Sequence, residues 1–401
     1  GFLPGLTATS GFGGITGAPF ERVSDASVAF DAKHNVWLAS SIPITPSTLV
    51  VPVVFISRST DGGQTWNAPV SIPAPTANKV NLDKNWSVCD DTPSSPHYGN
   101  CYTEFDNPGQ TDLEYMSTST DGGLTWSQPV SPTGNPHGLG GQPVVQPNGT
   151  VIVPFETITG KEAAFSSTDG GASWGHAATI ANIAFNTVGG GLRTSPLPSA
   201  EIDGAGKVFV AWEDCRFRAK CSSNDIVFST SSDGVTWSPV TRVPIDPVTS
   251  GADHFIPGLA VDKATSGSTA HLALTYYYYP DATCNGGCQL DVGFISSTDG
   301  GLHWSAPTPL AGPTPLFEIA NTSQGRMVGD YISTSFNASG TAATVFALGL
   351  PQPSPSTFDE AMYAPTTPLS VASGATPATA GPVLSTGGTG TGALLQSTRK
   401  G

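Results

Sequence analysis

The sequence has few charged residues: Asp, Glu, Lys and Arg make up 12% of its 401 residues, about half the usual share. It has no run of about 18 consecutive apolar residues, so no membrane span is predicted. No long amphipathic helix and no signal peptide are recognisable, and we expect a chain that begins in a mature or trimmed form. The formal net charge of −15 disfavours nucleic acids and anionic membranes as partners.

Familiar catalytic motifs are also missing. The sequence contains no His-Glu-x-x-His zinc motif, no phosphate-binding loop and no nucleophile elbow. What it does contain is 47 Gly and 35 Pro, a composition that fits many short strands joined by tight turns.

One motif returns along the chain: an alternating apolar stretch, then Ser-x-Asp-Gly and, a few residues later, Trp. The Asp-Gly pair favours a tight hairpin, in which the Asp and the Ser or Thr hydroxyls bond the turn amides. We expect the Trp to pack on the sheet and to seal the gap to the next blade. Five copies recur at intervals of roughly 50 to 65 residues, the size of a propeller blade, at Asp61, Asp121, Asp169, Asp233 and Asp299.

This motif resembles the Asp box of the sialidase-like (BNR-repeat) propellers. The resemblance covers residues 20–365 and implies an all-β, six-bladed β-propeller with Asp-box hairpins and four-stranded antiparallel blades. Residues 1–19 are predicted to be an N-terminal segment, of which Gly14–Phe20 completes the last blade. Residues 366–401 have the Ser/Thr/Gly/Pro-rich composition of a tail. The resemblance implies the fold and does not by itself imply sialidase activity.

The six cysteines fall into three close pairs along the chain. Disulfides are favoured over a metal site because no His lies at zinc-ligand spacing from Cys215 or Cys284. Three disulfides indicate an oxidising compartment, and therefore a secreted or cell-surface protein. The predicted pairs are Cys89 with Cys101, Cys215 with Cys221, and Cys284 with Cys288.

The repeat hairpins of a propeller lie on one face, so a ligand is expected on the opposite face. Convergent arginines there would bind a carboxylate bidentately. The alternative is that the polar groups of this face pair with one another around a solvated channel. The predicted ligand-binding residues are Arg22, Arg193, Arg326, Asp330, His254 and Lys84.

Resemblance to sialidases also suggests catalytic roles. Those enzymes use an Arg triad, a Tyr nucleophile paired with Glu, and an Asp acid/base. The nearest equivalents here are Tyr331, Glu213 and Asp25. The sequence departs from the pattern, because Asn224-Asp225 stands where the second triad arginine is expected. The motif Phe-Arg-Ile-Pro is expected near the start of a sialidase, and the sequence here, Phe20-Glu21-Arg22-Val23, is only partly similar to it.

The leading hypothesis is therefore a secreted sialidase-like propeller that binds a glycan or protein ligand. One alternative is a glycoside hydrolase or lyase acting on extracellular polysaccharide. Another is a structural or assembly protein that self-associates through its C-terminal tail. No cofactor is predicted, although Asp25, Asp83, Asp253 and Asp330 offer oxygen ligands of the kind that Ca²⁺ takes.

Overall fold

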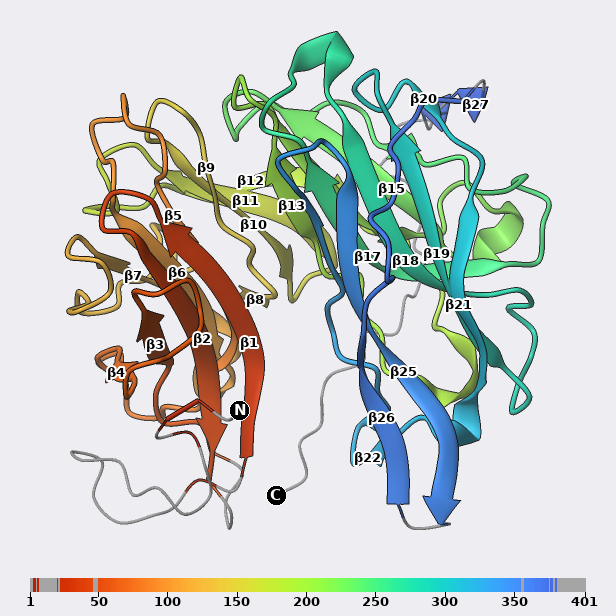
Figure 1. Ribbon diagram of the computed structural model, residues 1–401, viewed down its shortest axis with the longest axis horizontal. Helices are drawn as coiled ribbons and strands as arrows, with labels where there is room; N and C mark the ends of the chain where they lie inside the picture. Colours follow the sequence, from red (N-terminus) through yellow and green to blue (C-terminus); the bar gives the residue numbers. More distant parts are fainter. Residues whose placement is uncertain are drawn as a thin grey trace. The chain divides into compact units, whose positions relative to one another are not determined.

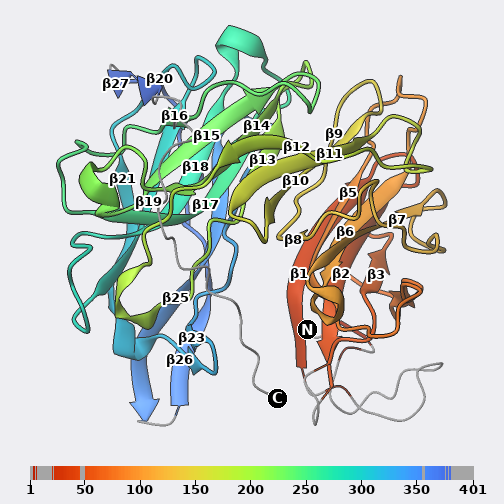
Figure 2. The same ribbon diagram turned by 180° about the vertical axis from the view of Figure 1, so that it is seen from behind.

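Antiparallel strands make up most of the structure. The computed structural model describes residues 3, 4, 6, 20, 22–45, 50–354, 357–374, 376–377 and 379–380. The chain divides into two units, Gly1–Ile180 and Ala181–Ala393, and each is described by itself. Among the described residues each unit contributes three blade sheets, which confirms the predicted all-β, six-bladed propeller class (Figure 1 and, from behind, Figure 2).

The first unit holds three sheets whose strands follow one another along the chain. The first sheet is β1 (Arg22–Asp31), β2 (Val36–Ile44), β3 (Phe55–Ser59) and β4 (Val70–Ser71). The second is β5 (Asp83–Cys89), β6 (Cys101–Asn107) and β7 (Leu113–Ser119). The third is β8 (Gly138–Leu139), β9 (Val144–Val145), β10 (Val151–Thr157), β11 (Lys161–Ser167) and β12 (Ala178–Asn182).

The second unit repeats this plan. Its first sheet is β13 (Ser199–Ile202), β14 (Val208–Asp214), β15 (Asp225–Ser231), β16 (Thr241–Arg242) and β28 (Thr379–Ala380). The next is β17 (Asp253–Val261), β18 (Leu272–Tyr279), β19 (Gln289–Ser297) and β21 (Thr308–Pro315). The last is β24 (Ser333–Phe336), β25 (Ala342–Ser354) and β26 (Thr357–Tyr363), and two small sheets pair β20 (His303–Trp304) with β27 (Thr376–Pro377) and β22 (Asn321–Thr322) with β23 (Gly325–Arg326).

Helical structure in the described chain is limited to single 3₁₀ turns. None of its helices has the length and apolarity needed to cross a bilayer. The turns are η1 (Pro108–Gln110), η2 (Gly189–Gly191), η3 (Ala219–Cys221), η4 (Gly267–Thr269) and η5 (Leu316–Glu318).

The repeat hairpins are held by the hydrogen bonds that their sequence predicts. In the first copy, Asp61 Oδ1 accepts the Ser59 hydroxyl at 2.8 Å and the Thr65 amide at 2.9 Å. The Ser59 hydroxyl in turn accepts the Gly63 amide at 2.9 Å. The same Ser-to-Asp bond recurs in the other four copies. These carboxylates are therefore committed to shaping turns.

Two of the repeat tryptophans, Trp174 and Trp304, pack between blades, but on the preceding blade rather than on the next one. Trp174 follows β11 and meets Tyr102 of β6 edge-on, with ring centroids 6.2 Å apart. Trp304 follows β19 and meets Phe228 of β15 at 6.1 Å. The hairpin before Trp174 packs on the preceding blade because its second glycine lies close to that blade. A Cβ on Gly171 would lie 2.9 Å from the Tyr102 ring.

The inner strands of three blades bulge near their start. β1, β5 and β17 each shift register there. Each bulge holds a non-glycine residue with positive φ: Asp25 at 51°, Lys84 at 54° and Ile256 at 49°. This conformation is costly for a residue with a side chain and persists where its surroundings enforce it. Two of the three residues are predicted site residues.

Neighbouring inner strands within each unit are joined by a recurring hydrogen bond. The Ser27 hydroxyl on β1 accepts the amide of Ser87 on β5 at 3.1 Å. In the second unit the Ser199 hydroxyl on β13 accepts the amide of Leu259 on β17 at 2.9 Å. Each bond ties adjacent blades at the same step of the repeat, so the inner strands hold a fixed spacing within the unit.

All three predicted disulfides are present. Cys89 and Cys101 face each other across β5 and β6. The other two bonds, Cys215–Cys221 and Cys284–Cys288, close short loops after β14 and β18. The second-unit disulfides therefore stiffen the loops that follow a second strand, as the sequence predicts.

The described part of the C-terminal segment lies along the second unit. Leu369 pairs with Ala342, and β27 and β28 pair with β20 and β16. Leu369 and Val371 also join an apolar cluster with Phe294. These residues add strand edges to blades of their own unit. The predicted closing strand Gly14–Phe20 lies outside the described residues except for Phe20, which packs edge-on against Phe55.

Candidate functional site

The predicted residues of the first unit lie on inner strands. Arg22 is exposed at the start of β1. Asp25, half-buried, occupies the β1 bulge and accepts the Ser24 hydroxyl at 2.5 Å. Lys84 occupies the equivalent bulge of β5, and only 3% of its surface is exposed. The ammonium of Lys84 is therefore a buried charge in this structure, and its predicted ligand contact remains a prediction.

In the second unit, two of the predicted arginines lie side by side. The Arg193 amide donates to the carbonyl oxygen of Arg326 at 2.7 Å. The Arg193 guanidinium donates to Asp330 Oδ2 at 2.7 Å and to Gln324. Arg326 donates to the Ile319 carbonyl at 2.7 Å, and Tyr331 follows Asp330 in the chain. The structure thus assembles Arg193, Arg326 and Asp330 as one group, with the Arg193 side chain 27% exposed.

Glu213 and His254 are buried. Glu213 lies at the end of β14, is fully buried, and accepts the amide of the bulge residue Ile256 at 2.8 Å. His254 packs against Tyr276 and Tyr278, with ring centroids 5.6 and 5.9 Å away. Burial lowers the pKa of His254 to about 4, so the imidazole is neutral over the physiological range. Both residues support the strand ends in this structure and do not present their polar atoms to solvent.

The loop closed by Cys215–Cys221 carries a buried ion network. Arg218 donates to Asp225 Oδ1 and Asp246 Oδ1, each at 2.6 Å. Arg242 donates to the same two oxygens at 2.8 and 2.6 Å. Two guanidinium groups and two carboxylates therefore alternate around a closed ring. The two positive and two negative charges of this ring balance. This is the mutual pairing of polar groups that the sequence analysis gives as the alternative to ligand binding.

Arg218 and its partners are not among the site residues predicted from the sequence. Asp225 enters the sequence analysis only as a departure from the sialidase pattern, and nothing in the sequence marks Asp246 or Arg242 as its partners. Two basic residues directly after Cys215, in a loop closed by a disulfide, were the available signal. Arg216 follows the same rule, since its guanidinium forks onto Asp214 at 2.6 and 2.8 Å.

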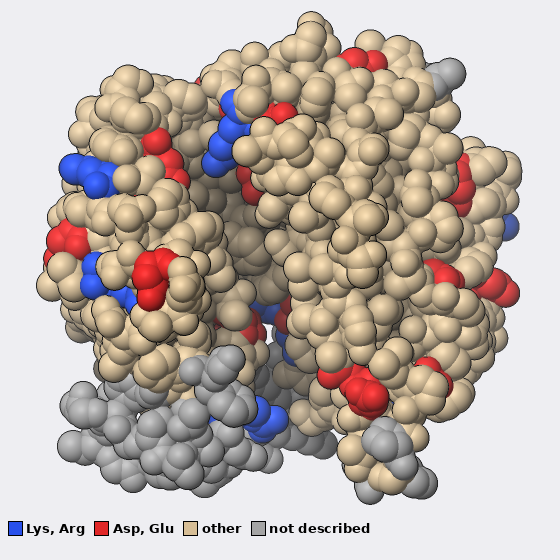
Figure 3. Space-filling model, viewed as in Figure 1, with Lys and Arg blue, Asp and Glu red and all other residues tan. Residues whose placement is uncertain are grey.

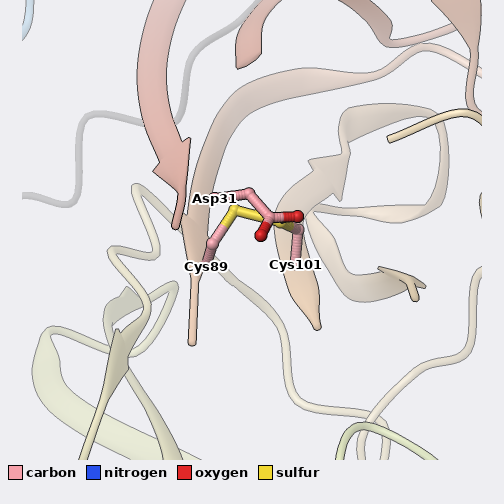
Figure 4. A group of neighbouring side chains, drawn as sticks. All are labelled: Asp31, Cys89 and Cys101. Carbon is pink, nitrogen blue, oxygen red and sulfur yellow. A yellow bond between two sulfur atoms is a disulfide. The ribbon is translucent and has the colours of Figure 1, made fainter. Parts of the chain in front are cut away.

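Within the described part of the chain, two groups of side chains bring three metal-ligating atoms within 4.8 Å of one another. The first is Asp31, Cys89 and Cys101, shown in Figure 4. Its sulfurs are joined in a disulfide, so they are not thiolate ligands.

The second group is Asp225, Asp246 and His254. It already holds Arg218 and Arg242, whose positive charges oppose a cation. Of the carboxylates predicted for Ca²⁺, Asp330 is engaged by Arg193. Asp253 Oδ1 accepts two bonds from Asn224. A calcium site on these residues remains a prediction.

Charged side chains are sparse on the face seen in Figure 3, where basic and acidic residues appear as isolated spots. No protein-family model and no curated protein matches the chain. Among solved structures it is similar to a variant of the α-L-arabinofuranosidase Arb93A from Fusarium graminearum. That likeness has 14% identity and a TM-score of 0.50, and covers 85% of this chain and 92% of that one.

Sialidases are also among the similar structures. The Hadza microbial sialidase Hz136 is 15% identical with a TM-score of 0.49, over 81% of this chain. The chain spans 63% of that sialidase's length. The intramolecular trans-sialidase from Ruminococcus gnavus is 13% identical with a TM-score of 0.46, covering 82% of this chain and 90% of that one. At 14% identity the likeness to the arabinofuranosidase concerns the fold alone, and the sheets and repeat hairpins described above are those of a sialidase-like propeller.

Proposed function

We propose that the protein is a secreted or cell-surface propeller that binds a glycan through the group formed by Arg193, Arg326, Asp330 and Tyr331. The observation that supports this is the pairing of two arginines on neighbouring backbone segments, one of them partly exposed. A guanidinium fork recognises carboxylates and sugar hydroxyls, and a carboxylate beside it accepts hydroxyl protons. Three disulfides support an oxidising, extracellular setting.

Binding would require little rearrangement of Arg193. Arg193 is already oriented by Asp330, so little side-chain entropy would be lost when a ligand carboxylate joins the pair. Asp330 is largely buried, with 8% of its side chain exposed, while Arg193 reaches solvent. We therefore expect Arg193 to make the ligand contact and Asp330 to position it.

A glycan array that includes uronic-acid and sialic-acid oligosaccharides tests this proposal, followed by calorimetry on the best ligand. Arg193→Met should weaken binding at least about tenfold, since one charge-assisted bond is lost. Lys263→Met is the control, because it removes an exposed positive charge from the same unit. No binding on the array, or equal affinity in both variants, would refute the proposal.

Hydrolysis by Glu213, Tyr331 and Asp25 remains a second prediction, supported only by resemblance. Aryl glycosides and the ligands from the array serve as substrates, with Glu213→Gln assayed beside the wild type. Because Glu213 is fully buried, turnover through it would need a rearrangement of β14. Self-association through the tail is tested by size-exclusion chromatography after deletion of residues 366–401.

A further inference from the structure

Three consecutive glycines lead into the segment that carries Arg193. Gly189–Gly191 form the single turn η2, and φ is +73° at both Gly190 and Gly191. Glycine loses more conformational freedom on folding than any other residue, so a run of three is costly to order. The turn also has no side-chain cap at its start. Contacts from elsewhere in the second unit therefore have to hold this glycine run in place.

The disulfide Cys284–Cys288 lies against the glycine run. A Cβ on Gly190 would lie 3.0 Å from the Cys288 sulfur and would overlap the side chain of Leu316. A Cβ on Gly189 would lie 3.6 Å from both cysteine sulfurs. Gly190 therefore has to be glycine, because the disulfide and Leu316 occupy the space that a side chain would need.

Apolar packing joins the disulfide to the residues on either side of the glycines. Val188 and Leu192 are buried in one cluster with Cys288, and Cys284 packs against that cluster. The exposed fractions of Val188, Leu192 and Cys288 are 3%, 5% and 1%. A shift of the disulfide would thus reach both ends of the glycine run, because closely packed groups cannot move independently.

The same run positions the backbone of Arg193. Leu192 pairs with Arg326 in a parallel bridge, and the Arg193 amide donates to the Arg326 carbonyl oxygen at 2.7 Å. Gly325 packs on the run as well, since a Cβ there would lie 2.6 Å from the Gly191 carbonyl oxygen. The contacts therefore lead from the disulfide through the glycine run to Arg193.

The loop that the disulfide closes is itself rich in conformational freedom. Asn285, Gly286 and Gly287 are exposed, and Asn285 has a φ of 51°. Within the loop, the Gly287 amide donates to the Cys284 carbonyl oxygen at 2.9 Å. Breaking the disulfide would return freedom to these residues. Cys288 would then no longer be held against the glycine run.

We propose that the Cys284–Cys288 disulfide is a redox switch for the ligand contact of Arg193. The oxidised form fixes the glycine run and Arg193, and the reduced form releases both. The inference rests on the proposed function, because the contact that it regulates is the one proposed for Arg193. The structure holds the oxidised, binding form, so binding would develop fully once the chain is in an oxidising compartment.

The reductant would be a dithiol. Cys284 is partly exposed and Cys288 is buried, so a thiolate of the dithiol attacks the Cys284 sulfur and the Cys284–Cys288 bond breaks. The second thiol of the dithiol then displaces Cys284 and closes the dithiol's own disulfide. Two electrons and two protons pass from the dithiol to the two cysteines, which end as thiols.

Hydrogen exchange followed by mass spectrometry tests the conformational step without any ligand. Dithiothreitol should speed exchange in the peptide 188–193 of the full chain at least about fivefold, because the Arg193 amide loses its fixed partner on Arg326. In Cys284→Ser/Cys288→Ser the exchange should already be fast, and dithiothreitol should not change it further.

Binding is measured by calorimetry with the sialylated or uronate-terminated oligosaccharide that binds best on the array. Dithiothreitol should weaken wild-type binding at least about fivefold, because a loose segment then has to be ordered on binding, and oxidised glutathione should restore the affinity. Cys284→Ser/Cys288→Ser should bind as weakly as the reduced wild type. Cys89→Ser/Cys101→Ser, which removes the disulfide of the first unit, should bind and respond to dithiothreitol as the wild type does.

A pair of glycine variants tests the contact while the disulfide stays intact. Gly190 and Gly191 have the same φ of +73°, but a Cβ on Gly191 would have nothing within 4 Å. The backbone cost of alanine is therefore similar at the two positions. Gly190→Ala should weaken binding at least about threefold more than Gly191→Ala, because only the first displaces the disulfide and Leu316.

Three results would overturn the switch. One is exchange in the peptide 188–193 that reduction of the wild type leaves unchanged, a measurement that needs no variant to fold. Another is full affinity in Cys284→Ser/Cys288→Ser, and the third is equal affinity in Gly190→Ala and Gly191→Ala. The absence of any binding on the array would refute the proposed function, whereas the exchange experiment would still decide whether the disulfide controls the Arg193 segment.

Discussion

Replacing Arg218 by alanine should remove a large part of the stability of the second unit. Its side chain is fully buried and donates to two carboxylates and to the carbonyl oxygens of Pro247 and Ser250. Removing one partner from a buried ion pair costs about 3–5 kcal/mol, because the remaining charge stays desolvated. Arg242 still donates to both carboxylates, and Pro247 lies at the surface. We therefore expect a loss near the lower end, about 3 kcal/mol.

The assay is urea unfolding followed by circular dichroism and tryptophan fluorescence. Arg193→Ala is the matched control, since it breaks an ion pair of similar length whose arginine is 27% exposed. Such a pair contributes about 0–1 kcal/mol. Arg218→Lys should fall between the two, because an ammonium cannot reach four acceptors spread around a planar fork. Equal losses of unfolding free energy in Arg218→Ala and Arg193→Ala would show that burial does not make the ion network more stabilising than an exposed pair.

Two further changes test the repeat hairpins and the buried imidazole. Gly171→Ala should destabilise the protein at least about 1 kcal/mol more than Gly63→Ala; both glycines have φ +83°, but a Cβ on Gly171 would meet Thr118 at 2.3 Å, whereas on Gly63 the nearest atom is 3.7 Å away. Thermal unfolding of the two variants measures the difference, and equal shifts would contradict close packing at Gly171. Between pH 6.5 and 4 the free energy of unfolding should fall by about 3 kcal/mol more in the wild type than in His254→Gln. The folded pKa of about 4 means that the unfolded chain takes up the proton first, so the wild type loses stability as pH falls; parallel pH profiles for wild type and variant would contradict this.

The propeller could be predicted from sequence because its repeats are local. Ser59, Asp61 and Gly63 are close neighbours in the chain, and their hydrogen bonds form within one hairpin. The cysteine pairs could be predicted for the same reason, since each closes a short loop. A short-range pattern that returns five times fixes the fold class before any long-range contact is known.

The polar groups needed information that the sequence does not hold. Glu114 lies in an alternating apolar stretch, and the alternation shows only that Glu114 is on the same face of its strand as Met116. That this face also holds Glu104 and Asp106 depends on the register between β6 and β7. His254 was predicted to bind a ligand because it lies at the entrance of an inner strand. Its burial arises from Tyr276 and Tyr278 on the adjacent strand β18.

The two units neutralise their buried acids in different ways. In the second unit, Arg218 and Arg242 balance Asp225 and Asp246 at every pH at which carboxylates are charged. In the first, burial raises the pKa of Glu104, Asp106 and Glu114 and so favours their neutral form. With 16 basic residues for 31 acidic ones, the chain has too few cations to pair every carboxylate. A carboxyl whose pKa is raised in the folded state contributes stability that is lost as the pH rises through that pKa. A rise in pH should therefore weaken the blade of β5, β6 and β7 before it disturbs the ion network around Asp225.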